Sequence, residues 1–114
     1  MLINCKVFIA AVATVVSFSA YASTGNRLLE HCLAPKGSGL AVACVSYVDG
    51  VADTLAGISA LMCVPGEVNV GQMRDVGVRY LQAHPETRHR PAAELFIAAW
   101  AEAWPCPKPR PAPR

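Results

Sequence analysis

The sequence predicts a small all-α fold, in which four helices form an up-down domain stapled by two disulfides. Apolar residues recur at helical spacing in four segments, and proline, glycine or capping residues mark the ends of each segment. Four of the five cysteines follow a short apolar N-terminal run, and an even number of cysteines in a small exported chain is typical of disulfides.

Residues 1–22 read as a cleaved signal peptide. Lys6 gives a positive start, Val7–Phe18 is a short apolar run, and Ala20-Tyr21-Ala22 has the small-x-small pattern of a signal peptidase site. A retained anchor is the alternative, but the run is shorter than the about 20 residues that span a bilayer. We therefore expect export to the periplasm, no stable membrane anchor after cleavage, and a helical domain over residues 23–106.

The first predicted helix covers Gly25–Leu33, with Thr24 as its N-cap and Pro35 just after its end. The second helix is the longest, from Ser38 to Cys63, with Ser38 as its N-cap, and the rest of the fold is expected to pack around it. Two internal glycines in this helix cost roughly 1 kcal/mol each, which the continuous apolar stripe outweighs. The stripe consists of Leu40, Cys44, Tyr47, Val51, Leu55, Ile58 and Met62.

The third predicted helix runs from Val70 to about His84, and Asn69 with Gln72 forms a capping box at its start. Pro85 ends it, and a polar turn over residues 85–90 follows. The fourth helix starts at Pro91 and continues to Trp104. Its predicted buried side consists of Leu95, Phe96, Ala99, Trp100 and Ala103.

Helix lengths decide how the four cysteines pair. Cys44 and Cys63 lie about 28 Å apart along one helix, which excludes a bond between them. Cys32 lies at the opposite end of the bundle from Cys63. In an up-down bundle the second and fourth helices end on the same side, so Cys63 meets Cys106 and Cys32 meets Cys44. Zinc binding is disfavoured because the sequence has no C-x-x-C motif and no paired histidine spacing.

The tail over residues 107–114 alternates proline with basic or small residues, so we expect it to be disordered and extended. Between residues 23 and 106 the chain has six basic and eight acidic side chains. A nucleic-acid-binding surface needs a basic stripe on the folded domain, and this charge balance argues against one.

No residue pattern indicates an enzyme, a cofactor or a metal site. Asp49 and Asp53 share one helix face, where such pairs are more often solvated than catalytic. His84, Glu86 and His89 flank a proline that breaks the helix, so no common face presents them to a metal. The aromatic line of Phe96, Trp100 and Trp104 is either core or a partner-binding face, and both interpretations remain open.

The chain also resembles the Rap/Tai family of type VI secretion amidase immunity proteins. The resemblance covers Gly25–Cys106 and rests on the ordered set of segments GNRLLEHC, ACVSYVDGVADT and CVPGEVNVGQMRDVGVRYLQAHPETRHRPAAELFIAAWAEAWPC, including all four cysteines. It implies a periplasmic helical protein that binds and blocks a peptidoglycan amidase, often as a homodimer. The proline-rich basic tail departs from the family pattern.

Two surfaces are candidates for contact with such a partner. The turn between two prolines, with Glu86, Arg88, His89 and Arg90, could present rigid polar groups to a cleft. Asp49 and Asp53 could steer a basic partner. The turn could instead be merely solvated, and the alternative function is a periplasmic chaperone or interaction module without a cognate toxin.

Overall fold

The computed structural model describes residues 22–56, 60–108 and 111–113. Within these ranges no strand is present, and the only β-type pairing is an isolated bridge between Thr24 and Pro91. The predicted all-α fold of four helices is confirmed. Its elements are α1 (Gly25–Cys32), α2 (Gly39–Ala56), α3 (Val70–Ala83), the short 3₁₀ helix η1 (Pro85–Thr87) and α4 (Ala92–Ala103).

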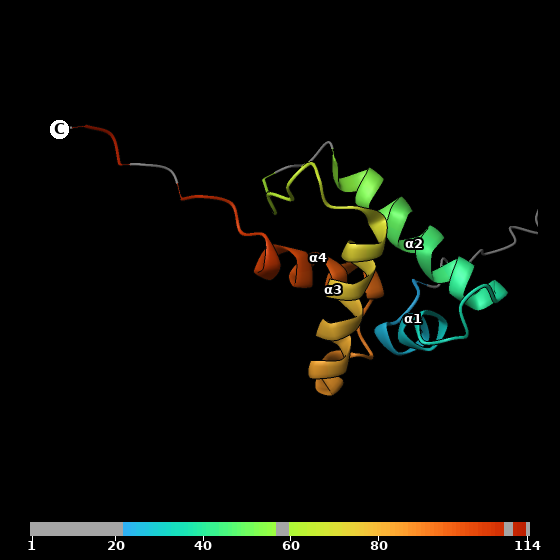
Figure 1. The fold of residues 1–114 in the computed structure, drawn as a ribbon. Helices are drawn as coiled ribbons and strands as arrows, with labels where there is room; N and C mark the ends of the chain where they lie inside the picture. The colour runs from blue at the N-terminus through green and yellow to red at the C-terminus, as the bar shows by residue number, and fades with distance from the viewer. Residues whose placement is uncertain (1–21, 57–59, 109–110, 114) are drawn as a thin grey trace, which may run out of the picture.

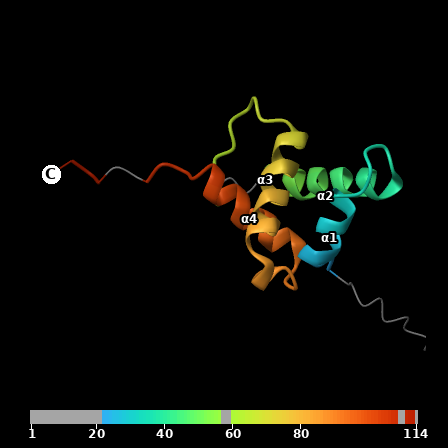
Figure 2. The same cartoon turned by 60° about the horizontal axis from the view of Figure 1, so that its bottom comes forward.

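The helices differ in how much of their surface the domain covers. Figures 1 and 2 show α3 lying against α4 at the centre, with α1 beside them and α2 at the edge of the molecule. The interface between α3 and α4 is the most extensive, and α2 packs mainly against α1 and α3. The outer side of α2 is therefore left open.

Both predicted disulfides are present. Cys32–Cys44 joins the end of α1 to α2 across a Cα separation of 5.1 Å, and Cys63–Cys106 joins the loop before α3 to the chain after α4 across 4.8 Å. The predicted signal peptide lies outside the described residues except for Ala22, and so do Arg110 and Arg114 of the tail.

The predicted helix caps are also confirmed. The side-chain oxygens of Thr24 and Ser38 each accept a hydrogen bond from the backbone N–H of the third residue of the following helix, at 3.3 and 3.2 Å. Asn69 and Gln72 exchange side-chain to backbone hydrogen bonds of 2.9 Å in both directions, which is a complete capping box. These contacts satisfy amides that a helix start leaves unpaired.

The predicted end of the second helix is wrong. α2 ends at Ala56 in the described part of the chain, whereas the sequence predicted helix as far as Cys63. Continuing the helix to Cys63 would add about 10 Å of rigid rod. The chain instead turns back, so that Met62 is buried and the N–H of Cys63 donates to the carbonyl of Trp104 at 2.9 Å.

The predicted buried stripe of α2 is also partly wrong. Leu40 was expected inside but is 45% exposed, whereas Val48, which was not on the stripe, is fully buried. Cys44, which was on the predicted stripe, is buried and bonded to α1, and Val48 lies one turn further along on the same side of the helix. Ile58 lies outside the described residues.

The core is centred on Trp100 of α4. Its indole N–H donates to the carbonyl of Met73 at 2.9 Å, and its ring meets Phe96 edge to face, with centroids 5.6 Å apart at 90°. Gly77 of α3 lies so close to Phe96 that a Cβ atom there would overlap the aromatic ring. The buried core residues also include Leu28, Leu29, Cys32, Cys44, Val48, Met62, Leu81, Ala92 and Leu95.

We expect Gly77→Ala to lower the free energy of unfolding by about 2 kcal/mol. Helix propensity favours alanine by about 1 kcal/mol, but overpacking a closed core costs about 1–3 kcal/mol or more, and the overlap with Phe96 is severe. Urea unfolding measures the difference.

Gly50→Ala is the matched control. A Cβ at Gly50 meets nothing within 4 Å, so the same substitution should stabilise by about 0.5–1 kcal/mol. Equal effects at the two positions would contradict the close packing of α3 on α4.

Candidate partner-binding surfaces

The turn between α3 and α4 has a fixed backbone. The N–H of Thr87 donates to the carbonyl of His84 at 3.2 Å, and the N–H of Arg90 donates to the carbonyl of Thr87 at 2.9 Å. Each of these hydrogen bonds closes a turn of four residues, so together they restrict the backbone from His84 to Arg90.

The start of α1 supports the same turn from the other side. The N–H of Gly25 donates to the carbonyl of Arg90 at 3.0 Å, and the N–H of Asn26 donates to the carbonyl of Arg88 at 2.8 Å. Both amides belong to the first turn of a helix and lack partners within it. Gly25 must be small here, since a Cβ would lie 2.9 Å from the Arg88 carbonyl oxygen.

The four predicted contact residues of the turn divide into two pairs. Glu86 and His89 are exposed, and within the described part of the chain neither side chain has a hydrogen bond or an ion pair. Arg90 is held by an ion pair with Glu94, one turn further along α4. Arg88 is half-buried, and its Nε atom is buried without a hydrogen-bond partner. The projecting groups of the turn are therefore Glu86 and His89.

His84 does not join them. Its ring stacks on Tyr80 with centroids 4.0 Å apart, and its Nδ1 atom lies 2.8 Å from the Tyr80 carbonyl oxygen. The side chain thus folds back along α3, away from the tip of the turn. Across the ranges that the structure describes, no three His, Cys, Asp or Glu side chains gather as metal ligands.

Asp49 and Asp53 lie on the exposed side of α2, and neither has an ion pair within the described ranges. Their spacing of four residues puts both carboxylates on the same helix face. They come from a different element than the turn, and no described hydrogen bond or ion pair connects the two surfaces. The two sequence-predicted candidates are therefore separate.

Sequence reasoning missed an exposed apolar area on α2. Val42 is 58% exposed and Val45 is 37% exposed, and with Lys36 and Arg74 they line a pocket of about 460 Å³. The guanidinium of Arg74 is fixed there, because it donates to the Cys32 carbonyl at 3.1 Å and forms an ion pair with Asp75 at 2.8 Å. The available signal was that α2 has apolar residues on every side, which indicates either a buried helix or an interface.

By length and composition α2 is able to cross a membrane, with a mean hydropathy of 1.3 and only 17% of its 18 residues buried. Two features favour protein contact instead. Asp49 and Asp53 would be costly in a bilayer, and the disulfide at Cys44 ties the helix to α1.

These observations define a class: a small, disulfide-stapled helical domain with rigid polar and apolar surfaces suited to binding another protein. Residues 24–106 match the family model of Rap1a immunity proteins, and the chain belongs to this family. This confirms the resemblance seen in the sequence. Neither the curated proteins nor the solved structures gave a match. Family membership makes a protein effector the expected partner and favours an inhibitor without catalysis of its own.

Proposed function

We propose that this protein is a periplasmic immunity protein that binds and inhibits a peptidoglycan amidase effector of a type VI secretion system. The observation that carries the proposal is the match to the immunity family over residues 24–106. The signal-like residues 1–22 support action in the periplasm, where a peptidoglycan hydrolase meets its substrate.

The turn is the proposed inhibitory element. Glu86 and His89 project from a backbone held by η1 and by the first amides of α1, so binding needs little further ordering of this segment. Glu86 accepts hydrogen bonds from a catalytic histidine, and His89 bonds polar groups of the cleft. Arg88 is half-buried and Arg90 is paired with Glu94, so neither side chain is assigned to the contact. Asp49 and Asp53 act at longer range by attracting a basic surface of the amidase.

We expect the double variant Glu86→Ala/His89→Ala to bind the amidase encoded beside this gene about 30-fold more weakly. Interface hot spots cost about 1–2 kcal/mol each, and a loss of about 2 kcal/mol corresponds to that factor. Isothermal titration calorimetry measures affinity, and peptidoglycan hydrolysis measures inhibition.

The matched control is Glu67→Ala/Lys108→Ala, which also replaces two exposed polar side chains, one before α3 and one after α4, away from the turn. The control should bind normally. Unchanged affinity of the turn variant with intact folding would exclude the turn as the contact site. An adjacent amidase that the wild-type protein does not inhibit would refute the immunity function itself.

We further propose that two copies associate through α2. Val42 and Val45 leave apolar surface open, and an antiparallel pairing brings the Lys36 end of one helix near the Asp53 end of the other. A two-fold arrangement of this kind is self-complementary in charge as well as in shape.

Val42→Asp should convert the dimer to a monomer, because it places two desolvated carboxylates in the interface. Gln82→Asp, which adds the same charge at an exposed position of α3, should leave the dimer intact. Sedimentation velocity at several concentrations distinguishes the species. A wild-type monomer that instead suppresses aggregation of unrelated unfolded proteins would favour the chaperone alternative.

A further inference from the structure

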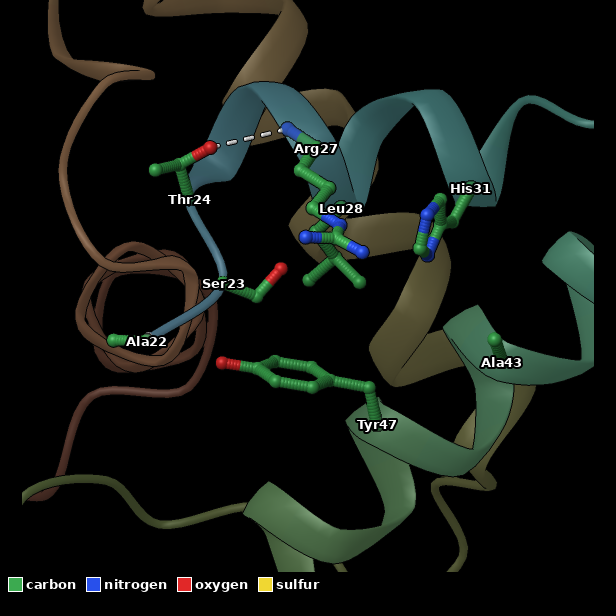
Figure 3. Close-up of a pocket in the computed structure, with 8 residues that line it drawn as sticks. All are labelled: Ala22, Ser23, Thr24, Arg27, Leu28, His31, Ala43 and Tyr47. Carbon is green, nitrogen blue, oxygen red and sulfur yellow. Dashed lines mark hydrogen bonds between the residues drawn. The ribbon is translucent and has the colours of Figure 1, made fainter. Parts of the chain in front are cut away.

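A pocket of about 440 Å³ lies between the start of the described chain, α1 and α2 (Figure 3). None of the residues that line it is acidic, whereas Arg27 and His31 both belong to it. Because these two residues are four apart on α1, they share one face of the helix. The pocket is therefore cationic through Arg27, and none of its lining residues carries a negative charge.

Figure 3 shows the guanidinium group of Arg27 and the imidazole of His31 directed toward the same space, with the hydroxyl of Ser23 pointing toward Arg27. Within the described part of the chain the Arg27 guanidinium has no ion pair. It is thus available for the paired hydrogen bonds that a guanidinium makes with a carboxylate.

The floor of the pocket is the ring of Tyr47, beside the apolar side chain of Leu28. Burial raises the pKa of the Tyr47 phenol above its usual value of 10.0, and a hydrogen bond with the backbone of Ala93 only partly opposes this. The phenol is accordingly neutral at pH 7 and adds no negative charge. An aromatic floor beneath a guanidinium and an imidazole suits an anion attached to a short apolar body.

The predicted signal peptidase site falls in the wall of this pocket. Cleavage after Ala22 removes one lining residue and creates a new α-amino group on Ser23, another lining residue. Since α-amino groups ordinarily have a pKa near 8, most of these groups carry a positive charge at pH 7. Processing would therefore open the pocket further and add a second positively charged group beside Arg27.

We propose that this pocket is a carboxylate-binding site, formed by Arg27, His31 and Tyr47 and completed by the amino group of Ser23 in the processed protein. The ligand is a peptide carboxylate, either a chain terminus or an acidic side chain. The site lies on α1 and α2, and its operation does not depend on the proposed amidase inhibition.

The test uses the processed protein purified from the periplasm, with its N-terminus determined by mass spectrometry. An N-acetylated alanine tripeptide with a free C-terminal carboxylate is titrated while backbone amide NMR shifts are recorded. We expect saturable shifts around Arg27, His31 and Tyr47, and at least tenfold weaker binding of the same peptide with a C-terminal amide. A C-terminally amidated peptide with a central glutamate distinguishes a side-chain carboxylate from a chain terminus, and binding of either peptide supports the site.

Arg27→Gln/His31→Gln should weaken binding at least tenfold, and Arg27→Gln alone, at an exposed position, provides a variant with little risk to folding. Arg79→Gln is the matched control, because it removes one exposed cation outside the pocket and should bind normally. Periodate converts an N-terminal serine to a glyoxylyl group, which removes the Ser23 amino group and should weaken binding further.

Three results would overturn the proposal: no saturable binding, equal binding of the acid and amide peptides, or wild-type affinity in folded Arg27→Gln/His31→Gln. A mature N-terminus other than Ser23, or full affinity after periodate treatment, would overturn the part assigned to the Ser23 amino group.

Discussion

Replacing Cys63 and Cys106 together by alanine is expected to lower the free energy of unfolding by about 4 kcal/mol. The bond closes a loop with a sequence separation of 43, and the chain-entropy relation gives this magnitude for such a loop. Domains are typically stable by about 5–15 kcal/mol, so the loss is large. Cys63 is exposed and Cys106 half-buried, so little packing should be lost with the sulfur atoms.

The Cys32→Ala/Cys44→Ala variant separates loop entropy from packing. Its loop has a separation of only 12, which gives about 3 kcal/mol, but both cysteines are buried, at 2% and 0% exposure. The Cys32/Cys44 variant should therefore lose more unfolding free energy than the about 3 kcal/mol that loop entropy gives. The Cys63/Cys106 variant should lose no more than its own entropic value. Urea midpoints measure both, and a Cys63/Cys106 variant with the wild-type midpoint would contradict the stapling role of this bond.

Local signals in the sequence were enough to place the helix starts and the disulfides. Thr24, Ser38 and Asn69 cap helices through their own side chains, so a few adjacent residues determine each start. The cysteine pairing was predicted from which ends of the helices lie on the same side of the domain. The predicted pairing is correct even though α2 ends earlier than predicted, because Cys63 still lies next to Cys106 after the end of α4.

Which side of α2 is buried could not be predicted from its own residues. Apolar side chains occupy every side of this helix, so periodicity alone allows more than one buried face. The choice between Leu40 and Val48 is made by contacts with α1 and α3, including the disulfide at Cys44. These are tertiary constraints with no local sequence signature.

The candidate sites also combine features that local sequence predicts with features that depend on tertiary contacts. The two prolines marked the turn correctly, but the separation of exposed Glu86 and His89 from half-buried Arg88 depends on how α1 packs behind it. The cationic pocket joins Ser23, Arg27 and Tyr47 from separate elements. Only the four-residue spacing of Arg27 and His31 was visible beforehand, and that spacing is common on helices.

Trp100→Ala is expected to lower the free energy of unfolding by about 4 kcal/mol. Trp100 is fully buried, and truncating a buried tryptophan typically costs 3–5 kcal/mol because a large cavity remains. The change also removes the hydrogen bond to the Met73 carbonyl and the edge-to-face contact with Phe96. Trp100→Phe keeps an aromatic ring but loses the N–H donor, so we expect an intermediate loss of about 2 kcal/mol.

Trp104→Ala is the matched control, at the residue that caps the C-terminal end of the same helix. Trp104 is only half-buried, so its truncation should cost about 1–2 kcal/mol, well below the cost at Trp100. Thermal unfolding and amidase titration on the same samples then show whether Trp100 and Trp104 each serve the core or the partner contact. Strong destabilisation at Trp100 together with a specific affinity loss at Trp104 would make Trp100 a core residue and Trp104 a partner contact. Equal destabilisation at both positions would contradict the core geometry, because Trp100 is fully buried against α3 whereas Trp104 is only half-buried.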